Sequence, residues 1–197
     1  MSAPIKLNFK IYQGSTFNEV LRWETSTKVY KQISGITKSA PIEVTTSTAH
    51  DIPNGWRAKI TNVVGMKEIN SDSVYHQITS TGGSTFQINA INAIGYTDYT
   101  SGGVVEYNEP VDLAGYTARM QVRGKITDTE VLVTLTTENG GVEIDNVNKT
   151  ISLLISATDT AAFTFPSGVY SLELVSSTGV VTPFINGTVS LVQEVTR

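Results

Sequence analysis

The sequence contains no cysteine and only two histidines among its 197 residues. The absence of cysteine excludes disulfide bonds, thiolate nucleophiles and zinc sites built on cysteine ligands. Basic residues are also few, with 14 Lys and Arg against 18 Asp and Glu, so the formal net charge is −4. This balance argues against a nucleic-acid-binding protein that relies on its overall charge.

Long apolar runs are missing as well. No window of the sequence approaches 18 consecutive apolar residues, so we expect no membrane-spanning helix. The N-terminal segment MSAPIKLNFKIYQG lacks the uninterrupted apolar core of a secretory signal. We therefore expect neither a membrane partner nor secretion.

The chain is rich in short segments in which apolar and polar residues alternate. Apolar residues make up 40% of the sequence, which is enough to build a buried core. Alternation predicts strands near residues 7–11, 17–23, 116–122, 131–135, 151–155, 169–175 and 188–195. Short strands at roughly 8–12-residue spacing, with turn signals between them, predict an antiparallel sandwich or barrel.

The middle of the chain has a different texture, because Ser, Thr, Gly and Asn are dense from about Ser34 to Val105. We interpret residues 35–106 as a small β-barrel inserted into an outer sandwich made of residues 1–34 and 107–197. Such an insertion is tolerated when the ends of the inserted domain lie close together. The predicted fold class is all-β, an Ig-like antiparallel β-sandwich interrupted by an inserted small β-barrel.

Helical signals are confined to two short places. Asp159 follows Ser156 at the spacing of a capping box, which predicts one turn of helix there. A second single turn is expected within residues 65–73.

Residue types that carry catalysis or bind metals form no recognised pattern. His50 beside Asp51 could join a catalytic triad, but a turn residue whose ring bonds a backbone group is the favoured interpretation. His76 is interpreted as an exposed strand residue. Asp145 and Asn148 lack the other ligands of a calcium loop, and no pair of carboxylates stands out for glycosidase chemistry. We expect no catalytic residue, no metal, no cofactor and no enzymatic activity, with a cell-wall hydrolase as the rival class.

The segment GYTARMQVRGK places two arginines on the polar face of a strand. Arg119 and Arg123 are about 13 Å apart along that strand, too far to hold one small anion between them. Three interpretations stay open for this pair. They are a solvated face with cross-strand carboxylates, a protein interface, where arginine is favoured, and a contact with nucleic acid or phosphate.

Three aromatic residues near loops form the other candidate contact surface. Trp56, Tyr96 and Tyr99 could bind carbohydrate or protein, because Trp and Tyr are enriched at such contacts. The same residues are also typical of the core of a small barrel. Tyr99 is the one we expect to be most exposed.

A family resemblance enters with residues 6–30 and 108–197. The segments IYQGSTFNEVLRWE and, above all, DLAGYTARMQVR resemble tailed-bacteriophage virion proteins and are similar to the N-terminal β-sandwich of baseplate upper proteins. The inserted segment resembles the small β-barrel named after the first catalytic cysteine half-domain of ubiquitin-activating enzymes. That resemblance is carried by His50, Gly55, Gly65, Met66, Asn70, Phe86 and residues 96–102. Because the chain has no cysteine, no thioester chemistry is implied, and the usual HGL…GD turn reads HDIPNGW.

The two resemblances together imply a structural role in a tailed-phage virion, since phage tail proteins often carry the inserted module. The expected function is a tail or baseplate adaptor or accessory protein, with a capsid decoration protein and a host-surface glycan-binding module as alternatives. The expected partners are other virion proteins and further copies of the chain, with host glycan as a possible partner and no nucleic acid. The expected location is the virion, assembled in the cytoplasm of the host bacterium.

Overall fold

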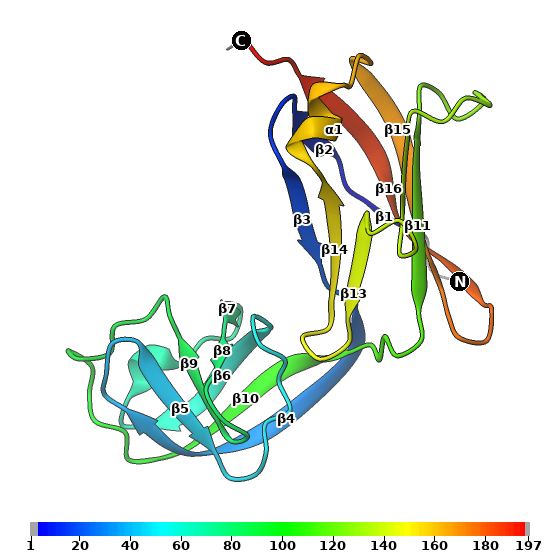
Figure 1. Ribbon diagram of the computed structural model, residues 1–197. Helices are drawn as coiled ribbons and strands as arrows, with labels where there is room; N and C mark the ends of the chain where they lie inside the picture. The colour runs from blue at the N-terminus through cyan, green and yellow to red at the C-terminus, as the bar shows by residue number, and fades with distance from the viewer. Residues whose placement is uncertain (1–3, 196–197) are drawn as a thin grey trace. The chain divides into compact units, whose positions relative to one another are not determined.

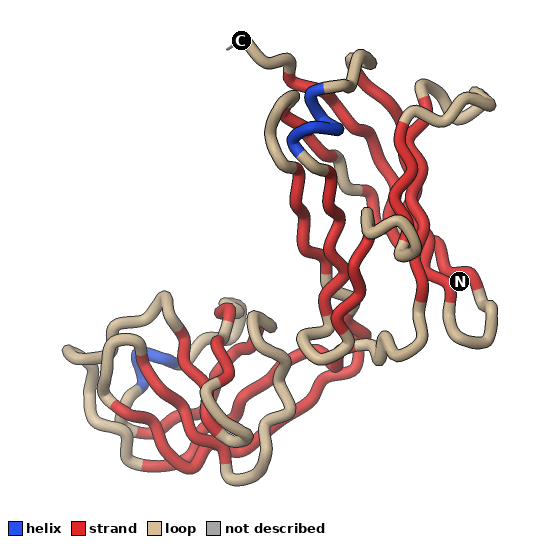
Figure 2. Tube along the Cα trace, in the orientation of Figure 1, coloured by secondary structure: helices blue, strands red, loops and turns tan. Residues whose placement is uncertain are grey.

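The computed structural model describes residues 4–195, and they are nearly all β, with 51% strand and 4% helix. The chain divides into two compact units (Figures 1 and 2). One contains residues up to 22 and from 112 onward, and the other contains residues 23–111. The first is a β-sandwich and the second a nearly closed β-barrel, so the predicted fold class is confirmed.

The larger sheet of the sandwich has six strands. They are β1 (Ile5–Lys6), β2 (Phe9–Tyr12), β11 (Thr117–Arg123), β12 (Val133–Thr136), β15 (Ser167–Val175) and β16 (Val181–Val192). The order is β1-β16-β15-β11-β12, and β2 also pairs with β16. Strands β1 and β2 run parallel to β16, whereas the other pairs are antiparallel. The N-terminal segment thereby completes a sheet that is formed mainly by the C-terminal half of the chain.

A three-stranded sheet faces the larger one and closes the core. Its order is β13 (Val142–Asp145), β14 (Thr150–Ile155) and β3 (Phe17–Leu21), all antiparallel (Figure 1). Alternate residues point inward and are buried, as the alternation predicted for Ala118, Met120 and Val122. On the inner side of the larger sheet, Phe9 of β2 stacks on Tyr170 of β15, with ring centroids 5.1 Å apart. Leu7 departs from the expected inward face, because it lies between β1 and β2 and is 37% exposed.

The predicted single turn of helix closes one end of the sandwich. Helix α1 (Ala157–Ala161) begins after Ser156, whose hydroxyl accepts from the Asp159 N–H at 3.1 Å and donates to its carboxylate. The predicted turn of helix is therefore present with Ser156 as its N-cap, but the Asp159 carboxylate bonds to the Ser156 hydroxyl and not to its backbone N–H, as a full capping box would. The Thr160 hydroxyl is fully buried and donates to the Ser15 carbonyl at 2.8 Å, which ties the helix to the turn between β2 and β3.

The inserted unit is a seven-stranded sheet that curls on itself. Its strands are β4 (Glu24–Thr37), β5 (Ile42–Thr46), β6 (Arg57–Val64), β7 (His76–Gln77), β8 (Thr79–Ser80), β9 (Thr85–Ile88) and β10 (Ser101–Pro110). The order β7-β6-β10-β4-β5-β9-β8 puts β7 and β8 at opposite ends, although only Ile78 separates them in the chain. Buried Ile78 exchanges hydrogen bonds with Gly55 and Trp56 and so brings the two ends together. The other expected turn is the 3-10 helix η1 (Lys67–Ile69).

The insertion enters and leaves through a long antiparallel pair, β4 and β10. The Val111 N–H donates to the Trp23 carbonyl at 3.0 Å, so the ends of the inserted unit are adjacent, as an insertion requires. The boundaries expected at 34/35 and 106/107 fall inside these two strands, whereas the compact units divide at 22/23 and 111/112. The difference arises because the change in composition begins partway along β4. The first part of that strand already belongs to the inserted unit but does not yet show the new composition.

Candidate functional site

The outward face of the six-stranded sheet carries a continuous row of polar residues. A single row of residues in register crosses five strands: Thr134, Gln121, Ser171, Asn186 and Lys6. Each member can donate a hydrogen bond, and none is acidic. Adjacent strands lie about 4.8 Å apart, so the row extends over about 19 Å.

Two hollows lie along this row and share Gln121 and Ser171. One has a volume of about 410 Å³ and includes Arg119 and Glu173, and the other has about 400 Å³ and includes Lys6 and Arg123. Both are open to solvent and are lined by hydroxyl, amide and charged side chains, with Val169, Tyr170 and Ile126 in the second. A face of this kind suits contacts with a polar partner surface.

The two candidate arginines have different local roles. Arg119 is opposite Glu173 on β15, and its Nε donates to Glu173 Oε2 at 2.9 Å with the Arg119 side chain 58% exposed. Arg123 donates through Nη1 to the carbonyls of Asp128 and Thr129 at 2.7 and 2.8 Å, and through Nη2 to Gln121. Arg119 thus forms the cross-strand pair that one interpretation expects, and Arg123 braces a loop.

That braced loop presents an apolar side chain at the rim of the second hollow. Asp128 also accepts from the Lys125 N–H at 2.8 Å, so the loop after β11 is held from both sides. Ile126 at its tip is 89% exposed. The loop thus places one exposed aliphatic side chain beside a polar hollow.

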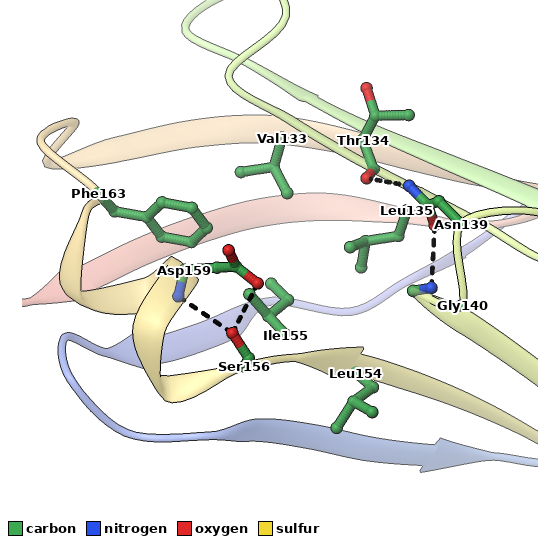
Figure 3. Close-up of a pocket in the computed structure, with 11 residues that line it drawn as sticks. Val133, Thr134, Leu135, Asn139, Gly140, Leu154, Ile155, Ser156, Asp159 and Phe163 are labelled. Atoms are coloured by element: carbon green, nitrogen blue, oxygen red, sulfur yellow. Dashed lines mark hydrogen bonds between the residues drawn. The ribbon is translucent and has the colours of Figure 1, made fainter.

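Another hollow of the sandwich, about 440 Å³ in volume, lies between β12 and the β14–α1 connection (Figure 3). Its apolar lining includes Val133, Leu135 and Phe163. Asn139 occupies the free edge of β12, because its side chain donates to the Thr134 carbonyl and accepts from the Thr136 N–H. This side chain takes the hydrogen bonds that another strand would make, so it protects the edge from strand addition.

The three candidate aromatic residues belong largely to the barrel core. Trp56 is 1% exposed, and its Nε1 donates to the Asn108 carbonyl at 3.0 Å, so its indole offers no surface to a ligand. Tyr96 and Tyr99 are partly buried and pack against the same core. The Tyr99 hydroxyl donates to the Gly102 carbonyl at 3.0 Å. The core interpretation therefore describes Trp56, and the two tyrosines keep only part of their rings at the surface.

The histidines and the Asp145 turn are held by local hydrogen bonds. His50 is buried, and its Nδ1 accepts from the Ile52 N–H at 2.9 Å, which leaves the proton on Nε2 facing the Gly82 carbonyl at 2.9 Å. His76 is half-buried in β7. Asp145 accepts from the Asn148 side chain at 2.6 Å in an Asx-type turn. Within residues 4–195, no three His, Cys, Asp or Glu side chains gather closely enough to hold a metal ion.

One charged cluster on the barrel was not expected from the sequence. Tyr75 lies under three cations, with Lys28 Nζ, Arg57 Cζ and Lys59 Nζ at 5.0, 5.5 and 5.5 Å from its ring centroid. The Tyr75 hydroxyl donates to Glu106 at 2.8 Å, and Glu106 forms ion pairs with Lys28 and Lys59 at 3.3 and 3.1 Å. These residues come from β4, β6, β10 and the loop before β7, and no motif in the sequence links them.

The cluster shifts the titration of its central carboxylate. Burial acts to raise the pKa of Glu106, but hydrogen bonds from Tyr75, Lys59 and Lys28 outweigh it and hold the pKa below its usual value. The pKa of Lys28 is raised, chiefly by its hydrogen bond to Tyr75. Both charges are thus stabilised by the network, which is a structural feature that fastens three strands of the barrel together.

Comparison with known families bears on the inserted unit. Residues 37–108 match the family model of the ubiquitin-activating enzyme E1 FCCH domain. The predicted resemblance of the inserted barrel to that domain is therefore confirmed, and without cysteine the barrel has no thiol for thioester formation. A search of curated proteins gave no match to the chain. The match covers less than half of the chain, so the resemblance of the sandwich to phage proteins stays a prediction. Among the described residues, no helix combines the length and apolar character needed to cross a membrane.

Proposed function

We propose that this chain is a structural component of a tailed-phage virion, where it assembles through protein–protein contacts as a tail or baseplate adaptor or accessory protein. The supporting observation is the combination of two units. A sandwich with the resemblance carried by DLAGYTARMQVR is interrupted by a barrel that matches the FCCH domain, and the sandwich bears a wide polar face in register.

The chemistry of the hollows also supports a binding role. In the hollow beside β12 and α1, Asp159 is engaged by the hydroxyl of Ser156 at the N-terminus of the helix. The hollow that includes Arg119 and Glu173 combines one ion pair with neutral polar groups. The glycan-binding alternative loses one of its three aromatic candidates, because Trp56 is buried.

The experiment is to find the protein on purified particles. Particles of the phage that encodes the chain are purified on a density gradient and washed in high salt, and their proteins are identified by mass spectrometry. Gold-labelled antibodies raised against the recombinant chain then locate it by electron microscopy, with antibody pre-absorbed on the same protein as the control. We expect label at the tail or baseplate. Label over the head would favour the decoration alternative, and absence from washed particles would contradict a virion role.

A further inference from the structure

The charges of the sandwich are segregated between its two faces. Outward positions of the six-stranded sheet carry four cations, Lys6, Lys10, Arg119 and Arg123, against one acid, Glu173. This basic face, defined by those four cations, has a formal charge of +3 in a chain whose net charge is −4. A positive face of this kind attracts negatively charged surfaces.

The opposite side of the sandwich is acidic. Glu143 and half-buried Asp145 point outward from β13, with Asp145 engaged by Asn148. Two further exposed acids border this sheet, Glu138 in the turn before β13 and Asp159 in α1, where Asp159 also lines the hollow beside β12. We call these four residues the acidic face. Outward positions of β3, β13 and β14 include no Lys or Arg, and Lys149 in the nearby turn is engaged by Asp112 at 3.0 Å. Two apolar side chains lie on the same outward side, Val20 and Leu154, which are 49% and 44% exposed.

The barrel shows that this segregation is not general in the chain. Among the described residues of the barrel, every Lys and Arg except Lys67 lies in an ion pair. In the described part of the sandwich, only Arg119 and Lys149 do so. The barrel therefore pairs nearly all of its cations with its own acids, whereas most cations of the sandwich form no ion pair.

We propose that copies of this chain associate head to tail, with the basic face of one sandwich against the acidic face of the next. The two faces are different surfaces of one molecule, so the contact is heterologous and can close a ring or continue along an assembly. Opposite charges bring the faces together, and burial of Val20 and Leu154 adds an apolar contribution. The proposal names a partner for the structural role above but requires only a second copy of the chain.

The size of the faces sets the expected strength. At about 4.8 Å between strands, the three-stranded sheet is about 10 Å wide between its outer strands, so the contact is smaller than the roughly 800 Å² per partner of a standard interface. We therefore expect weak association of the isolated protein, visible at high micromolar concentration and strengthened on a particle by multiple simultaneous contacts. It is expected at low ionic strength and is lost near 1 M salt, where the Debye length falls to about 3 Å.

The test is sedimentation of the full chain and two variants that each disable one face. In the first, Lys6→Glu with Lys10→Glu reverses two exposed charges of the basic face. In the second, Glu138→Lys with Glu143→Lys reverses two charges of the acidic face. The control is Lys38→Glu with Lys67→Glu in the barrel, which changes the net charge by the same amount as the first variant. Circular dichroism confirms that each variant is folded.

Each result either supports or overturns the proposal. At low salt, we expect the wild-type chain and the barrel control to have an average molar mass above the 21.3 kDa of the monomer. Each face variant alone should remain monomeric. A mixture of the two face variants retains one intact basic and one intact acidic face, so it should form a 1:1 dimer and stop there. A monomeric wild type, an equal effect of the control, or a mixture that fails to dimerise would each overturn head-to-tail association. None of these results depends on whether the chain is found on virions, so the two proposals fail separately.

Discussion

Arg119 on β11 and Glu173 on β15 lie directly opposite each other, and the guanidinium Nε donates to the carboxylate Oε2 at 2.9 Å. The pair is solvent-exposed and is bordered along the strand by Gln121 and then Arg123. Exposed pairs of this kind contribute little to stability, about 0–1 kcal/mol. The arrangement therefore leaves Arg119 free to serve a contact without a large cost to the fold.

We predict that Arg119→Ala and Arg123→Ala differ in their effects on stability. Arg119→Ala should change the free energy of unfolding by less than about 1 kcal/mol, because only an exposed ion pair is lost. Arg123→Ala should cost about 1–3 kcal/mol, because a charged donor to two loop carbonyls is removed. Urea denaturation measures both, and limited proteolysis should reveal cleavage after residue 124 in Arg123→Ala alone. Equal effects of the two substitutions would contradict the bracing role of Arg123.

Trp56 should be essential for the barrel to fold and irrelevant to ligand contact. Trp56→Ala should destabilise the protein by about 3–5 kcal/mol, as expected for a large side chain removed from a core. Trp56→Phe keeps much of the apolar volume but loses the hydrogen bond to Asn108, so a smaller loss, on the order of 1–2 kcal/mol, is expected. Unfolding followed by circular dichroism provides the measurement. A Trp56→Ala protein as stable as wild type would show that the indole does not support the core.

Glu106 should make the barrel sensitive to acid. Its pKa is lower in the folded protein than in the unfolded chain, so the stabilisation is present above the ordinary pKa of a glutamate and is lost as pH falls through the folded value. Glu106→Gln should lower stability at pH 7 by about 1–3 kcal/mol, because hydrogen bonds to a charged group are weakened. The variant should lose less further stability than wild type between neutral pH and about pH 3, and parallel acid profiles would contradict the network. Glu43→Gln is the matched control, because Glu43 lies elsewhere in the barrel and accepts a hydrogen bond from the Gln87 side chain.

Tyr107 should make the barrel sensitive to alkali. Burial, with help from the negative charges of Asp51 and Glu109, raises the pKa of Tyr107 to about 12, and its hydroxyl donates to the His50 carbonyl at 2.8 Å. Because the folded pKa lies above the unfolded one, the stabilisation is complete below about pH 10 and is lost as pH rises toward the folded value. Tyr107→Phe should be less stable at neutral pH and show a shallower decline above pH 10. Tyr30→Phe is the control, since the Tyr30 side chain is 60% exposed.

The sequence predicted the architecture where local patterns carry enough information. Strict alternation on either side of Met120 identified β11 and its buried face, and the spacing of Ser156 and Asp159 identified α1. The limits of the insertion were harder to predict, because β4 and β10 continue through the change in composition. Pairing between strands far apart in the chain decides where one unit ends, and no local pattern reports it.

The candidate site was predictable only in part for the same reason. Alternation indicated that Arg119 and Arg123 point outward, but the register that aligns Gln121 with Ser171 and Asn186 depends on strands some 50 and 65 residues later. The cluster around Tyr75 likewise depends on folding of the barrel. The burial of Trp56 could not be predicted either, since a tryptophan after a turn signal suits a surface or a core equally well until its neighbours are known.

Electron cryomicroscopy of intact phage particles tests the structural role most directly. We predict that density for the sandwich and its inserted barrel is found in multiple copies on the particle, with the outward face of the six-stranded sheet covered by a neighbouring protein subunit. The variant Arg119→Glu with Arg123→Glu should then be depleted from particles relative to wild type. A reconstruction without this density, or one in which that face is exposed to solvent in every copy, would contradict the role proposed for it.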